Sequence, residues 1–325
     1  MGYGSYSYEA HEAMARTRAD MPRQEVFKQV HCHPLMDPRG VKVRESRDSP
    51  THPQSLGIVF ALDVTGSMGT IPELLARKYL PTFMKTLLDS GIPDPQVMFM
   101  AVGDANHDRA PLQVGQFESA ERQMDHWLTC SYVEGGGGTF GVESYELALY
   151  FAARHTAMDC WQKRHKRGYF FMTGDERPYP YVSHKEINLL IGAPLDRDIP
   201  TGQAVDELQR TFEPFFLIPD LQRRRNCERA WRDLLGDRVI CMEDPVDTVD
   251  VAAGLVGLCE GVFPHLDALA QRLEKEGTPR QRLGAVMRAL TPFAATLGRD
   301  GTPPPRLEEN APLPLGDDAS GHRRG

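Results

Sequence analysis

The sequence lacks any long apolar run. No stretch approaches the roughly 18–20 uninterrupted apolar residues that a membrane-spanning helix needs. The N-terminal residues carry neither a basic segment nor an apolar core, so we expect no secretory signal. An excess of basic residues is also missing: 37 Lys and Arg stand against 45 Asp and Glu, which gives a net charge of −8. That balance argues against a general nucleic-acid binder.

Cysteine pairs and several catalytic motifs are absent as well. The 6 cysteines are scattered along 325 residues and none belongs to a C-x-x-C pair, which indicates a reducing compartment. The cytoplasm is therefore the expected location. No Gly-Lys-Ser/Thr phosphate loop is present, which excludes a P-loop nucleotide hydrolase. Ser67 does not lie in a G-x-S-x-G elbow, which argues against a serine hydrolase.

What the sequence does contain is an alternation of apolar runs with helical segments. Residues 56–62, 97–102, 169–172, 215–218 and 239–242 are apolar at almost every position. Strands of this kind must be covered on both faces, as in parallel sheets flanked by helices. Helical segments are expected between them, at 71–88, 118–128, 142–158, 221–235 and 249–258. The alternation predicts an α/β fold, a doubly wound and mostly parallel sheet flanked by helices.

Composition divides the chain into four parts. Residues 1–54 are polar and broken by Pro and Gly, and we interpret them as an N-terminal extension. Residues 55–262 hold the α/β pattern. Residues 263–299 carry two apolar stripes separated by Gly277-Thr-Pro279, which predicts a C-terminal helical hairpin. Residues 300–325 are rich in Pro and poor in apolar residues, which is typical of a disordered tail.

Side chains with oxygen atoms follow the predicted strands. Asp63, Thr65 and Ser67 alternate after the first apolar run, Thr139 follows a run of glycines, and Asp175 follows the third apolar run. Ligands bind at the carboxyl ends of the strands in open α/β sheets, so these residues are expected to converge. A donor set made only of oxygen suits hard cations such as Mg²⁺, Mn²⁺ or Ca²⁺ and is poor for Zn²⁺.

Plainer interpretations of the same residues stay open. Asp63 and Ser67 could cap the helix that follows them. The polar residues 104–108 after the second apolar run could shape the rim of the site or merely cap their own loop. Residues 136–141 match G-x-G-x-x-G, but the match does not directly follow a strand, which argues against a dinucleotide site.

In this order and strand context, Asp63-x-Thr65-x-Ser67, Thr139 and Asp175 resemble the metal-ion-dependent adhesion site (MIDAS) of von Willebrand factor A (vWA) domains. The run Asp-Val-Thr-Gly-Ser-Met-Gly is most similar to intracellular vWA domains. The resemblance implies that the three hydroxyl residues bind Mg²⁺ or Mn²⁺ directly. It implies that the two aspartates bind the ion directly or through water.

One departure from the family pattern concerns the last loop. It reads Thr-Gly-Asp where many members read Thr-Asp-Gly, so Glu176 competes with Asp175 for the metal role. Thr65 stands where serine is commoner, and it keeps the hydroxyl that the site needs.

The resemblance implies a protein-binding module without catalytic residues, in which an Asp or Glu of a partner completes the coordination of the ion. Free-standing intracellular vWA proteins often act as adaptors beside AAA+ ATPases, so such an ATPase is the expected partner; a membrane or nucleic-acid partner is not expected. One alternative is a Mg²⁺-dependent phosphoester hydrolase with Asp104 or Glu176 as its base. Another is an RNA-associated scaffold that uses the basic segments 163–167 and 223–225.

Overall fold

The computed structural model of the chain describes residues 4–66, 68–135 and 141–297. Its largest sheet has the strand order β12-β11-β7-β2-β3-β4. The strands are β2 (Leu56–Asp63), β3 (Pro95–Val102), β4 (Leu112–Val114), β7 (Gly168–Thr173), β11 (Phe212–Ile218) and β12 (Val239–Cys241). All neighbours in this sheet are parallel except β3 and β4, which are antiparallel. The predicted α/β fold with a doubly wound, mostly parallel sheet is confirmed.

The order of the strands reverses beside β2. The chain runs from β2 outward to β3 and β4, then crosses to the other side of β2 and continues through β7, β11 and β12. The switch point therefore lies between β2 and β7. The crevice outside the carboxyl ends of two such strands is the usual ligand site of an open α/β sheet.

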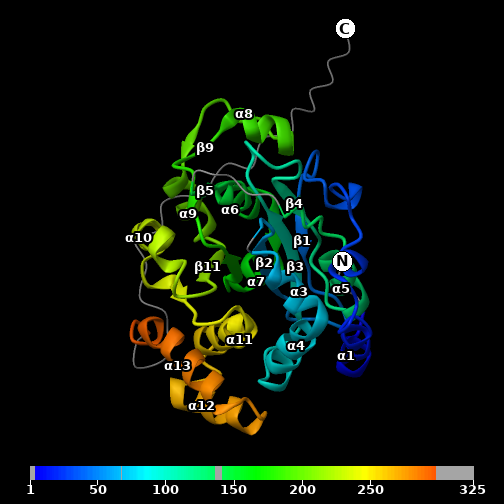
Figure 1. Cartoon of the computed structure of the whole chain (residues 1–325), viewed down its shortest axis with the longest axis vertical. Helices are drawn as coiled ribbons and strands as arrows, with labels where there is room; N and C mark the ends of the chain where they lie inside the picture. The colour runs from blue at the N-terminus through cyan, green and yellow to red at the C-terminus, as the bar shows by residue number, and fades with distance from the viewer. Residues whose placement is uncertain (1–3, 67, 136–140, 298–325) are drawn as a thin grey trace.

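Helices cover both faces of the sheet, as Figure 1 shows. Below the sheet in that view lie α4 (Leu80–Asp89) and α11 (Thr248–Cys259), which pack against each other. Above it lie α6 (Tyr145–Arg154) and α9 (Thr201–Leu208), which form another packed pair. Helix α10 (Arg224–Leu235) packs on β11 and β12. The strands are apolar on both sides because both sides are covered.

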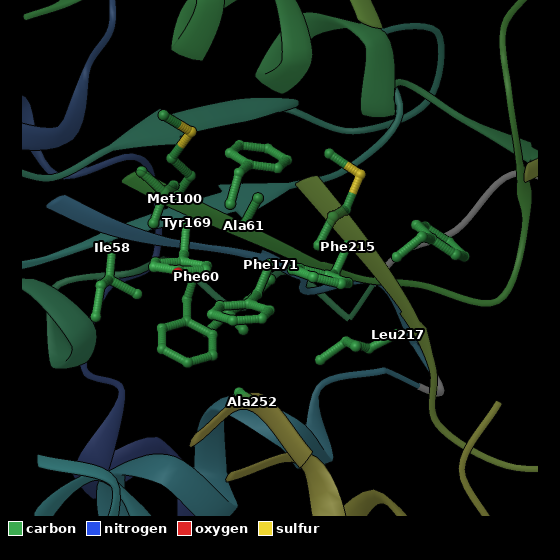
Figure 2. Close-up of a cluster of buried hydrophobic side chains, with 14 of the residues drawn as sticks. Ile58, Phe60, Ala61, Met100, Tyr169, Phe171, Phe215, Leu217 and Ala252 are labelled. Atoms are coloured by element: carbon green, nitrogen blue, oxygen red, sulfur yellow. The ribbon is translucent and has the colours of Figure 1, made fainter. Parts of the chain in front are cut away.

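A row of aromatic rings fixes the alignment of the central strands. Phe99, Phe60, Phe171 and Phe215 are direct partners on neighbouring strands, with ring centroids 6.1, 5.3 and 5.6 Å apart along the row. Figure 2 shows three of these rings on the side of the sheet that faces Ala252 of α11. A slip by one residue would turn these rings to the opposite face, so the packing locks β2 against β7. The same register pairs Leu62 with Thr173, just before the predicted metal loops.

The segments before and after the α/β region pack against it. Helix α1 (Tyr8–Thr17) contacts α4, and β1 (Arg44–Ser46) pairs in parallel with β6 (Thr156–Met158). Helices α12 (Leu266–Lys275) and α13 (Arg280–Ala294) pack together, and Phe293 of α13 makes an edge contact with the ring of Phe215 at 5.0 Å. The predicted division at residues 54, 262 and 299 stays a prediction, and the tail at 300–325 lies outside the described residues.

Several elements differ from the expectations. The helix expected at 71–88 is divided into α3 (Thr70–Leu74), the π-helical turn η2 (Leu75–Tyr79) and α4. Pro81 lies in the first turn of α4, where no amide hydrogen bond is lost. The helix expected at 142–158 is shorter, because 142–143 pair with β8 (Arg177–Pro178) and 156–158 pair with β1.

Short elements complete the fold. They are α2 (Arg23–Val26), η1 (Pro34–Met36), α5 (Glu121–Thr129), β5 (Val142–Glu143), α7 (Asp159–Arg164), β8 (Arg177–Pro178), β9 (Tyr181–Val182), α8 (His184–Glu186), η3 (Ile187–Ile191), β10 (Ile199–Pro200), η4 (Gly236–Arg238) and η5 (Pro245–Asp247). Among the described residues, no helix combines the length and apolar character that crossing a bilayer requires.

Candidate metal centre

Asp63 ends β2 at the switch point and is completely buried. One carboxylate oxygen, Oδ1, accepts hydrogen bonds from the backbone N–H of Thr65 at 2.9 Å and from its hydroxyl at 2.5 Å. The other, Oδ2, accepts from the hydroxyl of Tyr145 at 2.5 Å. Helix α3 starts after Gly69 without a side-chain cap. Asp63 therefore orders the loop that follows β2 and does not cap α3.

Tyr145 also explains the unusual order of residues in the last loop. Its phenol lies against Gly174, where an added Cβ would be 2.4 Å from the hydroxyl oxygen and 2.7 Å from Cζ. Only glycine leaves room for this ring beside Asp63. Position 174 therefore requires glycine, and the acidic residue comes after it, in the order Thr-Gly-Asp.

Asp175 is the carboxylate of this loop whose charge acts on Asp63, whereas the charge of Glu176 acts on Glu143. It is buried, and its Oδ2 accepts a hydrogen bond from Nη1 of Arg223 at 3.0 Å. Glu176 is only half-buried, and its backbone carbonyl accepts from the indole of Trp231 at 2.9 Å. Because β2 and β7 are paired, Asp175 lies near Asp63, and its charge adds to the raised pKa of Asp63. The geometry favours Asp175 over Glu176 as the ligand.

Some of the buried carboxylate groups at the site have no partner in the described part of the structure that neutralises their charge. Burial raises the pKa of Asp63 to about 7, although its hydrogen bonds from Thr65 and Tyr145 oppose the shift. Glu143, in β5, is also buried, and its Oε2 has no hydrogen-bond partner within the described part of the chain. Burial, together with the charges of Asp63 and Asp104, raises the pKa of Glu143 to about 9. Buried carboxylates without partners are costly, and a nearby cation offsets that cost.

The structure brings together some of the predicted ligands and is silent on the rest. Asp63, Thr65 and Asp175 meet at the switch point, whereas Ser67 and Thr139 lie outside the described residues and stay predictions. Within the described ranges, no group of three or more His, Cys, Asp or Glu is arranged to hold a metal ion. A site of two carboxylates and several hydroxyls contains no such group. The all-oxygen donors, and the Oε2 of Glu143 that has no hydrogen-bond partner among the described residues, fit a hard divalent ion.

The polar loop after β3 is a self-capped loop beside this site. Asp104 is completely buried and accepts from the backbone N–H of Asn106 and from the hydroxyl of Tyr179, both at 3.1 Å. It also pairs with His107. Asp108 accepts from the backbone N–H of Asp104 at 2.7 Å. The loop-capping interpretation of 104–108 accounts for these contacts.

The basic segment 163–167 forms ion pairs with one acid of its own helix and with acids from distant parts of the chain. These pairs are Lys163 with Asp159 and Asp48, Arg164 with Asp48, Lys166 with Glu260, and Arg167 with Glu213. Arg164 binds Asp48 through two nitrogens, at 2.8 and 3.0 Å. The segment therefore fastens the amino ends of the strands to their surroundings.

Sequence reasoning missed three residues of the site: Glu143, Tyr145 and the role of Arg223. Glu143 stands out in the sequence as an acid next to a buried apolar helix, which is a weak signal. Tyr145 gives no signal, because a tyrosine at the start of an apolar helix is ordinary core. Arg223 does give one, since a cation at the beginning of a helix opposes the helix dipole and needs another partner.

No protein-family model and no curated protein matches the chain. Among solved structures, it is similar to proximal thread matrix protein 1 of the mussel byssus, with 8% identity, a TM-score of 0.41, and coverage of 66% of this chain and 48% of that one. The same mussel protein with a zinc-occupied MIDAS motif gives 10% identity and a TM-score of 0.39, over 62% of this chain and 47% of that one.

Another similar structure is the pilus adhesin SpaC of Lactobacillus rhamnosus GG in its open conformation. Its identity is 12% and its TM-score 0.43, over 70% of this chain and 31% of that one. The chain spans less than half the length of each of these proteins. Similarity at this level assigns neither a family nor a function.

Proposed function

We propose that the chain is a metal-dependent protein-binding module of the vWA type, which holds an acidic side chain of a partner protein through a hard divalent ion. The observation that carries the proposal is the meeting of Asp63, Thr65 and Asp175 at the switch point of a doubly wound sheet. All three side chains offer only oxygen. Ser67 and Thr139 complete the proposed donor set.

Each described residue has a definite part in such a site. Asp63 supplies negative charge, and Tyr145 and Thr65 hold its carboxylate in one orientation. Asp175 supplies the second negative charge from the neighbouring strand, so that the two together balance a divalent ion. The ion, when bound, supplies an open coordination position for a carboxylate oxygen of the partner. We propose Mg²⁺ as the physiological ion, with Mn²⁺ and Ca²⁺ as substitutes, because none of the proposed ligands is His or Cys.

A binding role accounts for the surroundings of the site better than hydrolysis does. A hydrolase would need a base that reaches a water molecule near the ion. Asp104 is completely buried and held by Tyr179 and His107, so it does not offer that base, and the half-buried Glu176 is left as the one candidate of the two. An RNA-binding role loses its strongest support in the same way, because the cations of 163–167 are paired within the chain.

The cellular setting is part of the proposal. All the cysteines are free thiols, which suits the cytoplasm. There we propose an adaptor role beside an AAA+ ATPase, on the strength of the motif's resemblance to intracellular vWA domains.

Metal-dependent capture of a partner tests this function. The wild-type chain, Asp63→Asn and the control Asp237→Asn, at an exposed carboxylate far from the motif in sequence, are immobilised and exposed to host lysate with Mg²⁺ or with chelator. We expect a partner that the wild type and the control retain only in Mg²⁺ and that Asp63→Asn does not retain. Capture that is equal in Mg²⁺ and chelator, or equal for Asp63→Asn, would contradict the proposal.

A further inference from the structure

Arg223 lies across the two loops that carry the predicted ligands. Its Nη1 is 3.0 Å from Oδ2 of Asp175, in the loop after β7. The same nitrogen is 3.2 Å from Sδ of Met68, in the loop after β2. The guanidinium therefore bridges the two sides of the switch point, where the two loops come together.

The base of the side chain is held independently of these contacts. Nε of Arg223 is 2.8 Å from Oδ2 of Asp220, in the loop after β11. Oδ1 of Asp220 in turn accepts from the backbone N–H groups of Gln222 at 2.8 Å and of Arg223 at 3.0 Å. Asp220 thus anchors the loop and one edge of the guanidinium, while the other edge reaches the metal site.

The neighbouring arginines do not share this arrangement. Arg224 forms an ion pair with Glu228 one turn along α10. Arg225 lies beside Leu221 and Gln222 at a surface hollow and has no ion pair with a described residue. Of the three consecutive arginines, Arg223 is the one whose charge is directed at the predicted metal ligands.

A cation in this position opposes the binding of another cation. The guanidinium occupies one oxygen of Asp175 with a charge-assisted hydrogen bond, which must be broken or rearranged if that oxygen is to hold an ion or its water. Its positive charge also repels a divalent ion a few ångströms away, and burial weakens the solvent screening of that repulsion. Both effects lower the affinity of the site for the ion.

We propose that Arg223 is a built-in competitor of the divalent ion for Asp175, and that it sets the metal affinity of this site. The inference rests on the proposed metal site. In the ion-free chain Arg223 neutralises Asp175 and holds the loops together. When an ion binds, the guanidinium leaves Asp175 and stays on Asp220, at the rim of the site. The bound metal ion thereby replaces the guanidinium of Arg223 as the partner of Asp175.

Direct metal titration tests this role. The wild-type chain, Arg223→Gln, Arg223→Lys and the control Arg225→Gln are titrated with Mn²⁺, and the free ion is followed by electron paramagnetic resonance. We expect Arg223→Gln to bind Mn²⁺ at least about tenfold more tightly than the wild type. Arg223→Lys, which keeps the charge, should lie between the two. Arg225→Gln should stay within about twofold of the wild type, because its charge is not directed at the ligands.

Thermal unfolding gives a second readout that does not depend on titration. Without metal, Arg223→Gln should melt at a lower temperature than the wild type, since Asp175 loses its partner. Saturating Mn²⁺ should then raise its melting temperature by more than it raises that of the wild type, because tighter binding stabilises more.

The outcomes separate this inference from the proposed function. If the wild type binds Mn²⁺ and Arg223→Gln binds it equally or more weakly, Arg223 is not a competitor, while the metal site stands. If neither the wild type nor Arg223→Gln binds Mn²⁺, the metal site itself is wrong and the inference falls with it. Binding by Arg223→Gln alone would support the competition in its strongest form.

Discussion

Charged side chains are paired at one end of the central strands, whereas buried acids crowd together at the other. At the amino ends, the basic segment 163–167 is matched by the neighbouring Asp159 and by acids from three distant places, and Arg164 binds Asp48 through two nitrogens. At the carboxyl ends, buried carboxylates gather around Asp63 and Glu143, and their pKa values are raised. Paired charge at one end fastens the fold. The crowding of buried acids at the carboxyl ends is a cost that a bound cation would offset.

Paired and unpaired buried charges differ in what they indicate about a functional site. In an ion pair such as Arg167 with Glu213, each charge has a partner within the chain, so the pair does not indicate a ligand site. Glu143 does not, because its Oε2 is buried without a hydrogen-bond partner among the described residues. A strongly perturbed acid in a crevice is a candidate for function for that reason.

The largest effect on stability is expected from filling the space at Gly174. In Gly174→Ala the new methyl group would overlap the phenol of Tyr145, so the ring or the loop must move. We expect a loss of about 2–3 kcal/mol in the free energy of unfolding, as for other overpacked positions, together with weaker metal binding. Urea unfolding measures the first and Mn²⁺ titration the second. Gly202→Ala, where an added Cβ would make only an ordinary contact with Leu234 at 3.8 Å, is the control for side-chain volume. Full stability of Gly174→Ala would show that the loop is not packed as described.

At the amino end, removing an acid should destabilise the chain. In Asp48→Asn the half-buried guanidinium of Arg164 loses its charged partner, and we expect a loss of about 1–2 kcal/mol without any change in metal affinity. Hydrogen bonds from Arg164 hold the pKa of Asp48 well below its usual range against the effect of burial. The wild type should therefore keep this contribution above about pH 4 and lose it in more acidic solution. Urea unfolding at pH 7 and pH 3 tests both points; an Asp48→Asn chain with altered metal affinity would contradict the separation of the two ends.

At the carboxyl end, removing an acid should stabilise the chain. Glu143→Gln replaces a buried carboxylate by a neutral group of the same shape, so the ion-free chain should gain about 1–2 kcal/mol. The raised pKa of Glu143, about 9, means that the wild type loses stability as pH rises from about 4.5 towards 9, and the gain should grow over that range. Urea unfolding at pH 6 and pH 8.5, without metal, measures it. A destabilised Glu143→Gln would show that this acid is satisfied after all.

The smallest effect on stability is expected from His11, which lies at neither end of the central strands. His11 in α1 is buried beside the hydroxyl of Tyr6, and burial lowers its pKa to about 4. The unfolded chain binds the proton more readily, so stability should fall by about 1 kcal/mol between pH 7 and pH 5.5 from this group alone. His11→Gln should remove that part of the pH dependence. An unchanged pH profile for His11→Gln would show that His11 is not the group responsible.

Much of the fold could be predicted because it depends on local patterns. Residues 56–62 are apolar at almost every position, and that pattern indicates a strand covered on both faces. Strand β4 was missed because three residues at a sheet edge carry too little pattern. The end of the helix at Arg154 was missed because β6 exists only through pairing with β1, more than a hundred residues away.

The site divides in the same way. Asp63 and Asp175 could be predicted because each follows an apolar run, and the carboxyl ends of parallel strands share one edge. The need for glycine at 174 could not be predicted from the sequence. It comes from the ring of Tyr145, which belongs to α6 and packs against this loop. The contact of Arg223 with Asp175 joins residues 48 positions apart and leaves no trace in local sequence.

The most direct test of the account is calorimetric titration of the purified chain with Mg²⁺ and Mn²⁺. We predict saturable binding of one ion to the wild type, a loss of affinity of at least about a hundredfold in Asp63→Asn and Asp175→Asn, and unchanged binding in Asp48→Asn. Absence of saturable binding by the wild type, or binding that survives both substitutions at the carboxyl end, would contradict the metal site on which the proposed function rests.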